Sequence, residues 1–322
     1  MHPRRPLVAL ASMILLASCD DGTAPSDAGA GRDAARADAG GGTGDAGPPP
    51  PVDGGDTPDA GAPVGSAGCG NASPLTGART VDVMGMTGDY LVSLPSDYDP
   101  TQPYPLGFGF HGAGRTHENC HDGDCAGFQA AMGERAILVY IKSFTDAWPW
   151  PMDVREQNVA LFEAVLDVVR GDYCVDEGRM FVAGTSSGAS FSNVLGCRFG
   201  DRLLATAPVA GSMPETTGCT GPIAALVIHG VDDYHVPFVD GEAARDFYLD
   251  MNGCTHMPSV PIAELHDRVV MTRESHECAD YMGCPAGASV RWCEHSEGGY
   301  DGSTHGWPSF GGDEIWSFVS GL

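Results

Sequence analysis

The feature that most restricts the fold of this chain is a serine bracketed by glycines between an apolar strand and a helix. Residues 179–183 have the pattern of a short strand, Gly-Thr-Ser-Ser-Gly follows at 184–188, and residues 189–195 can form a helix. A strand that turns sharply into a helix places the serine at the carboxyl edge of a sheet, and glycines leave room for the turn. The pattern predicts Ser186 as a nucleophile. Ser187 competes with it but lacks glycine two residues to either side.

A serine nucleophile needs a base, and the base needs an orienting carboxylate, which follow in the order Ser, acid, His in this architecture. Residues 224–228 predict a strand that opens into a loop with two candidate acids, Asp232 and Asp233. His305 lies in a loop before the last predicted helix, from which it can reach the sheet edge, and is the predicted base. Of the other histidines near these motifs, His229 is predicted to support the acid loop. His276 and His295 are predicted to lie at the surface.

Backbone donors for an oxyanion are predicted at two places. Residues 106–110 form an apolar strand pattern that leads into His-Gly-Ala-Gly at 111–114, a turn that exposes N–H groups. We expect the amide of Ala113 to be one donor. The amide of Ser187, at the start of the helix, is the other.

The composition sets the class of the protein. The formal charge is −26, which argues against nucleic-acid binding, because contact with phosphates needs clusters of Lys and Arg. Residues 67–322 are long enough for one α/β domain. Their strand and helix patterns predict a mixed, mostly parallel sheet with helices on both faces. The predicted strands are 80–84, 90–94, 106–111, 137–142, 180–183, 205–209, 224–229 and 289–293, and the predicted helices are 128–135, 154–170, 187–199, 241–251 and 313–319.

The first 66 residues are predicted to lie outside the fold. Arg4 and Arg5 precede an apolar run at 7–16 that fits an export signal and ends in Leu-Ala-Ser-Cys. This resembles a bacterial lipobox, which would remove residues 1–18 and place lipid on Cys19. An ordinary signal peptide is the alternative. In 20–66, 38 of 47 residues are Gly, Ala, Asp or Pro, which predicts a disordered tether rather than a cleavable pro-segment. The protein is therefore expected to be exported, either as a cell-envelope lipoprotein held to the membrane through Cys19 or as a secreted protein.

Eight motifs occur in order along residues 67–322. They are Ala-Gly-Cys-Gly at 67–70, Tyr-Leu-Val-Ser-Leu-Pro at 90–95 with Tyr-Asp at 98–99, Phe-His-Gly at 110–112, Asp-Tyr-Cys-Val-Asp-Glu at 172–177, the serine motif, His-Gly at 229–230 with Asp233 and Val-Pro at 236–237, Asn-Gly-Cys-Thr at 252–255 and His-Gly-Trp-Pro at 305–308. In these motifs the chain resembles carbohydrate esterase family one, in the group of secreted feruloyl esterases and polyhydroxybutyrate depolymerases. The resemblance implies an α/β-hydrolase fold, Asp233 rather than Asp232 as the acid, and His305 as the base. Two departures, Ser187 inside the serine motif and Gly306 between His and Trp, concern the substrate more than the chemistry.

The resemblance implies an exported serine esterase that acts on an ester-bearing polymer or oligomer without a cofactor or metal. Feruloyl (cinnamoyl) esters of plant xylan are the first candidate substrate, hydroxybutyrate polyester the second and acetylxylan the third. Trp148, Trp150 and Trp307 are predicted to line an apolar pocket or to stack on sugar or phenolic rings, with ordinary packing as the alternative. The non-enzymatic alternative is a tethered carbohydrate-binding protein with an inactive hydrolase fold.

Ten cysteines remain after Cys19, an even number that suits disulfides in an exported protein. Cys120 and Cys125 lie in a segment rich in His and Asp, where a metal site is the alternative to a loop disulfide. Their spacing is not that of a usual zinc ligand pair, and the exported context favours the disulfide. Six cysteines match positions in secreted relatives: 69, 174, 197, 219, 254 and 284. Cys278 and Cys293 remain as a further candidate pair, and the connectivity stays open.

Overall fold

The computed structural model describes five stretches of the 322-residue chain, which are 63–72, 74–125, 127–149, 151–260 and 276–322. The predicted signal peptide, Cys19 and most of the tether lie outside the described residues, as does Trp150. Ser66, at the end of the predicted tether, is buried and donates a hydrogen bond to the Tyr173 carbonyl. Within the described ranges, no helix combines the length and apolar character that a membrane span requires.

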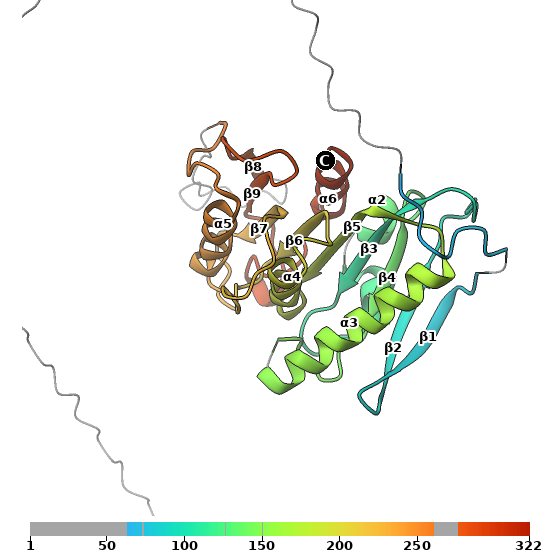
Figure 1. The fold of residues 1–322 in the computed structure, drawn as a ribbon. Coiled ribbons are helices and arrows are strands. Elements are labelled where there is room, and N and C mark those ends of the chain that lie inside the picture. Colours follow the sequence, from blue (N-terminus) through green and yellow to red (C-terminus); the bar gives the residue numbers. More distant parts are fainter. Residues whose placement is uncertain (1–62, 73, 126, 150, 261–275) are drawn as a thin grey trace, which may run out of the picture. The chain divides into compact units, whose positions relative to one another are not determined.

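The described strands form one sheet of nine in the order β1-β2-β4-β3-β5-β6-β7-β9-β8 (Figure 1). Six neighbouring strands in the middle of the sheet are parallel, in the order β4, β3, β5, β6, β7 and β9. At one edge β1 and β2 are added by antiparallel pairing, and at the other edge β8 pairs antiparallel with β9. The predicted mixed, mostly parallel sheet is confirmed. The strands are β1 (Gly77–Val83), β2 (Met86–Ser93), β3 (Tyr104–Phe110), β4 (Ile137–Ile141), β5 (Val175–Thr185), β6 (Ala205–Val209), β7 (Ala224–Gly230), β8 (His276–Asp280) and β9 (Val290–His295).

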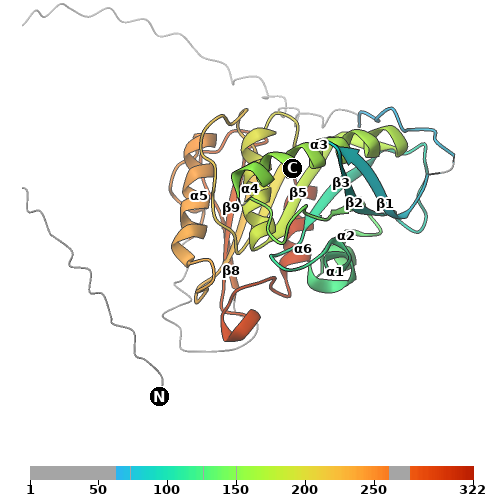
Figure 2. The same cartoon turned by 90° about the horizontal axis from the view of Figure 1, so that it is seen from below.

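Helices cover both faces of this sheet, as predicted (Figure 2). One face carries α3 (Met152–Asp172), α4 (Ser187–Arg198) and α5 (Phe238–Asn252). The other face carries α6 (Gly311–Ser320), α2 (Phe128–Met132) and the short α1 (His117–Asn119), which runs into the π-helical turn η1 (Cys120–Asp124). A separate apolar cluster fills each interface between sheet and helices. The layers explain why β4, β6 and β7 are buried along their whole length and have continuous apolar runs rather than alternation.

The sequence did not predict β8, and this omission explains one error. His295 was predicted to lie at the surface but is 1% exposed. It pairs with Gly230 of β7 on one side and His276 of β8 on the other, so β8 covers the strand that holds it. Burial lowers the pKa of His295 to about 4. His276, on the edge strand, is exposed as expected.

All ten described cysteines are paired, and the Cys120–Cys125 disulfide takes the place of the metal site that was its alternative. The pairs are Cys69–Cys174, Cys120–Cys125, Cys197–Cys219, Cys254–Cys284 and Cys278–Cys293. The predicted partnership of Cys278 with Cys293 is present. The longest loop belongs to Cys69–Cys174, which fastens the first described residues to the end of α3 across 105 positions.

Removal of Cys69–Cys174 by double alanine substitution should cost more stability than removal of Cys120–Cys125. Chain entropy assigns about 4.7 kcal/mol to a loop of about 100 residues and about 2 kcal/mol to a loop of five. Urea unfolding of the oxidised protein and of both double variants measures the difference. Equal losses would show that loop entropy does not set the cost, and many reactive thiols in the denatured oxidised protein would contradict the pairing itself.

Candidate active site

Ser186 occupies a strained turn between β5 and α4. Its backbone has φ 56° and ψ −120°, a conformation that non-glycine residues rarely adopt and that concentrates at functional sites. Its N–H is held by the Val209 carbonyl at the end of β6. A side chain at Gly188 would place its Cβ 2.3 Å from the Phe110 carbonyl oxygen, and one at Gly184 would lie 2.5 Å from Gly188. The two glycines are therefore required by close approach of backbones around the serine.

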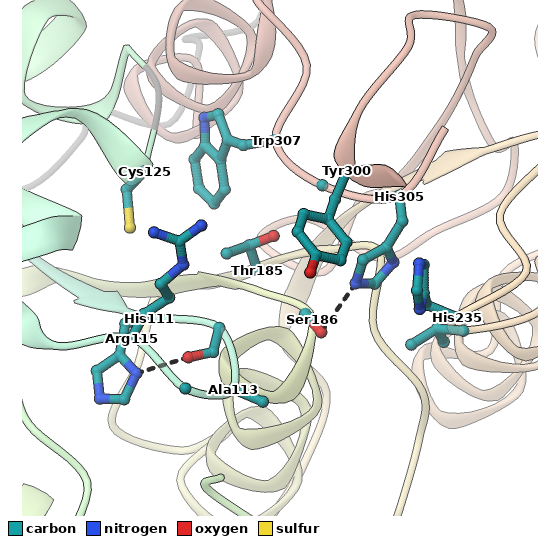
Figure 3. Close-up of a pocket in the computed structure, with 14 residues that line it drawn as sticks. His111, Ala113, Arg115, Cys125, Thr185, Ser186, His235, Tyr300, His305 and Trp307 are labelled. Carbon is teal, nitrogen blue, oxygen red and sulfur yellow. Dashed lines mark hydrogen bonds between the residues drawn. The ribbon is translucent and has the colours of Figure 1, made fainter. Parts of the chain in front are cut away.

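Ser186, His305 and Asp233 are joined by two hydrogen bonds although they come from distant parts of the chain (Figure 3 shows the first). The Ser186 Oγ lies 3.0 Å from His305 Nε2, and His305 Nδ1 lies 2.7 Å from Asp233 Oδ2. Because the carboxylate accepts a hydrogen bond from Nδ1–H, Nε2 is left without a proton and can accept the one on Ser186. This is the geometry that nucleophilic catalysis by serine requires.

The Asp233 carboxylate is held by its own loop. Its Oδ1 accepts hydrogen bonds from the N–H groups of His235 and Val236, both at 2.9 Å. The buried His229 donates from Nε2 to the Val236 carbonyl and lies 3.5 Å from Asp233 Oδ2. Burial by itself would raise the pKa of Asp233, but the hydrogen bonds from His305 and Val236 outweigh it and lower the pKa from its ordinary value. The carboxylate is therefore ionised and fixed in orientation.

Asp232 has a different environment. It is exposed, and its backbone connects the acid loop to the base loop: its N–H donates to Thr304 Oγ1 and its carbonyl accepts from Ser303 Oγ. The hydrogen bond to the His305 imidazole is made by Asp233 alone among these two acids. The adjacent carboxylates are thus separated by burial, one inside the site and one in solvent.

The loop after β3 carries Ala113 to the same site. His111 is buried, donates from Nδ1 to the Gly112 carbonyl at 2.8 Å and accepts at Nε2 from the Ser143 N–H at 3.2 Å. Burial lowers the pKa of His111 to about 4, so the ring stays neutral and can make both bonds at once. Ala113 lines the pocket beside Ser186, and Ser187 begins α4, where the first N–H groups have no partner within the helix.

The candidate site opens into a pocket of about 620 Å³ (Figure 3). Trp307 contributes to its wall, as predicted for this residue, together with several residues that were not predicted. Those residues are Arg115, Cys125, Thr185, His235 and Tyr300. Arg115 and Tyr300 could have been suspected, because Arg115 follows the glycine turn and Tyr300 precedes the base in the same loop; no pattern singles out the others.

The prediction that Trp148 contacts substrate is wrong. Trp148 is fully buried, stacks on Phe191 of α4 with ring centroids 4.8 Å apart, and donates from Nε1 to the His111 carbonyl. It therefore supports the glycine turn from behind and belongs to the core. The sequence could not distinguish Trp148 from Trp307. The side of the loop on which Trp148 lies is set by α4, which comes from another part of the chain and packs against it.

No family model matches the chain. The chain is 30% identical over 262 residues to feruloyl esterase C of Emericella nidulans, a match that covers 79% of this chain and 90% of the relative. The chain belongs to the feruloyl esterase family. A second member of that family, feruloyl esterase D of Neurospora crassa, is 26% identical over 245 residues, or 71% of this chain and 80% of the relative.

The fold agrees with this membership. The solved structure of acetyl xylan esterase from Aspergillus awamori matches with a TM-score of 0.57 over 76% of this chain and 99% of that one, at 12% identity. At that identity the likeness concerns the fold alone, and it supports the predicted α/β-hydrolase architecture. As a member of the feruloyl esterase family the protein is a carboxylic ester hydrolase, and the non-enzymatic alternative is set aside.

Proposed function

We propose that the protein hydrolyses esters through an acyl-enzyme formed on Ser186. The observation that carries this proposal is the continuous hydrogen-bonded series from Ser186 Oγ through His305 to Asp233 at the wall of the pocket. His305 Nε2 takes the Ser186 proton as Oγ attacks the carbonyl carbon, and Asp233 stabilises the imidazolium that forms. His305 then gives the proton to the leaving alkoxide. A water molecule, deprotonated by His305 in turn, releases the acid and restores the serine.

The oxyanion of each tetrahedral intermediate is assigned to the amides of Ala113 and Ser187. Both amides are held in position by the structure around them. His111 and Trp148 hold the turn before Ala113, and Ser187 is the first residue of α4. Backbone donors held in place in this way are worth about 3 kcal/mol each in the transition state, because they need no reorganisation when the charge develops.

We assign the acyl group to an aromatic acid of the feruloyl type. A volume of about 620 Å³ lies in the range of ~300–1,000 Å³ that accommodates drug-sized ligands and exceeds what an acetyl group needs. Trp307 offers an apolar face, and Arg115, in the same wall, offers donors for the phenolic and methoxy oxygens at the far end of such an acid. The family membership supports the same class of substrate.

A side-by-side assay of methyl ferulate, hydroxybutyrate oligomers and acetylated xylan tests the substrate. We expect the highest kcat/KM for methyl ferulate, because the pocket wall combines an indole ring with a guanidinium group. Trp307→Ala should lower kcat/KM for methyl ferulate by about ten-fold, because the substrate loses one aromatic contact and the area that it buries. The loss for an acetyl ester should be smaller. A higher kcat/KM for hydroxybutyrate oligomers or for acetylxylan would overturn the assignment.

We further propose that the protein is exported and that Cys19 becomes a lipid-bearing amino terminus. The support is the positive start, the apolar run and the Leu-Ala-Ser-Cys sequence. Mass spectrometry of the mature amino terminus, with Cys19→Ala as the comparison, tests this; an unmodified terminus that begins elsewhere would refute it.

A further inference from the structure

A row of exposed rings extends from the base over the surface of the protein. The His235 ring lies 5.0 Å from the His305 ring, and it contacts the rings of Tyr234 at 4.7 Å and Tyr300 at 5.5 Å. Tyr234 and Tyr300 are 60% and 61% exposed. We call Tyr234, His235 and Tyr300 the aromatic ledge. It combines two loops, one carrying the acid and the other the base.

The aromatic ledge is held in place by one hydrogen bond between these loops and by others within each loop. The Tyr234 hydroxyl donates to the Asp301 carbonyl at 2.5 Å, in the short 3-10 turn η3 (Tyr300–Gly302). The Tyr300 N–H donates to the His305 carbonyl, and the His235 N–H donates to the Asp233 carboxylate. Rings fixed by backbone contacts lose little conformational entropy when a ligand packs on them, which favours binding.

The chemistry of the leaving alcohol, which is the first product, decides which part of an ester the aromatic ledge faces. His305 Nε2 must deliver its proton to the leaving alkoxide, so the alcohol part of the ester lies beside His305. Arg115, Cys125 and Trp307 lie on one side of Ser186, whereas His235 lies on the other, beyond His305 (Figure 3). The acyl group therefore occupies the side of Trp307, and the alcohol extends past His305 toward His235, whose ring contacts that of Tyr300.

The surface of the aromatic ledge fits a neutral sugar. One face of a sugar ring carries C–H groups and packs on an aromatic ring, while its hydroxyl groups point outward to polar partners. Asp232 and Asp301 are exposed next to the ledge in the chain and offer acceptors for such hydroxyl groups. The formal charge of −26 disfavours a polyanionic alcohol.

We propose that the aromatic ledge is the subsite for the sugar that carries the ester. This rests on the proposed function, because the side on which the alcohol leaves follows from His305 as general acid. The aromatic ledge would be a second recognition element, which binds the alcohol part of the ester and not the acid part. An ester with a small alcohol, such as methyl ferulate, would leave the ledge empty.

Kinetics on two esters of the same acid test the proposal. For Tyr234→Ala and Tyr300→Ala, we expect kcat/KM for a feruloylated arabinoxylo-oligosaccharide to fall about five- to ten-fold more than kcat/KM for methyl ferulate, mainly through KM. Met152→Ala, which removes an apolar side chain that is 67% exposed at the start of α3, should change neither. Equal losses on both esters would overturn the subsite, because a damaged loop affects every substrate alike.

The Tyr234→Phe variant separates stacking of the ring on a sugar from the hydrogen bond to the Asp301 carbonyl. It keeps the ring and removes the hydroxyl group, so the ratio of the two kcat/KM values should stay within about two-fold of the wild-type ratio. If Tyr234→Phe lowered the ratio as much as Tyr234→Ala, the hydroxyl bond and not the ring face would be responsible, and the stacking proposal would be wrong.

A binding measurement distinguishes failure of this proposal from failure of the proposed function. Full-length Ser186→Ala protein is titrated by calorimetry with arabinoxylo-oligosaccharide that carries no feruloyl group. We expect saturable binding that Tyr234→Ala and Tyr300→Ala each weaken at least five-fold. Binding without ferulate hydrolysis by the wild type would keep the ledge and overturn the feruloyl assignment. Ferulate hydrolysis without sugar binding, or ledge-dependent KM values for hydroxybutyrate oligomers alone, would overturn the ledge as a sugar subsite.

Discussion

Replacement of Ser186 by alanine should lower kcat for ester hydrolysis by about 10⁵- to 10⁶-fold, since no other group replaces the attacking oxygen. The fold should be unaffected. The turn at Ser186 is held by its N–H, which bonds to the Val209 carbonyl, and alanine keeps this bond and the backbone conformation. Initial rates on methyl ferulate and the thermal midpoint of both proteins measure the two effects.

Ser187→Ala is the matched control, because Ser187 is the neighbouring serine and its Oγ makes no hydrogen bond in the described structure. Its backbone amide, the proposed oxyanion donor, remains, so activity should stay within about ten-fold of the wild type. A fluorophosphonate should label the wild type and Ser187→Ala but not Ser186→Ala. Retention of more than a few per cent of the activity by Ser186→Ala would refute the nucleophile.

Asp233→Asn should lower kcat by about 10⁴-fold, whereas Asp232→Asn should lower it by only a few-fold. An asparagine amide that donates to His305 Nδ1 favours the tautomer with the proton on Nε2, and that nitrogen can no longer accept the proton of Ser186. The loop should keep its shape, since the asparagine oxygen can accept the N–H groups of His235 and Val236 as Oδ1 does now. Steady-state rates for both variants provide the measurement.

The thermal midpoints of the two Asp variants should lie close to that of the wild type, so that a loss of rate is not a loss of fold. Losses of similar size for Asp232→Asn and Asp233→Asn, or a larger loss for Asp232→Asn, would mean that the orientation of His305 does not depend on the 2.7 Å bond to Asp233.

Short-range patterns were sufficient for the central part of the fold. The strand at 205–209 and the start of α4 after Ser186 were predicted at their observed positions, because strands buried on both faces are continuous apolar runs and the glycine motif requires a sharp turn. The edge was not predictable in this way. The polar residues of β8 have no apolar alternation, and only pairing with β9 makes them a strand. The burial of His295, which the sequence placed at the surface, is a consequence of that pairing.

The sequence by itself determined the serine motif, the two candidate acids, the histidine of the base loop and an even set of cysteines, because each depends on residues adjacent in the chain. The choice between Asp232 and Asp233 could be expected from family spacing, but burial of one and exposure of the other came with the loop contacts to His229 and Thr304. The tertiary structure alone decided three of the five disulfide partnerships, which are Cys69–Cys174, Cys197–Cys219 and Cys254–Cys284. It also decided the place of Trp148 in the core and the packing of Tyr234 and Tyr300 against His235 beside the base. Each of these depends on segments far apart in sequence, and their proximity is set by the packing of helices on the sheet rather than by any local preference.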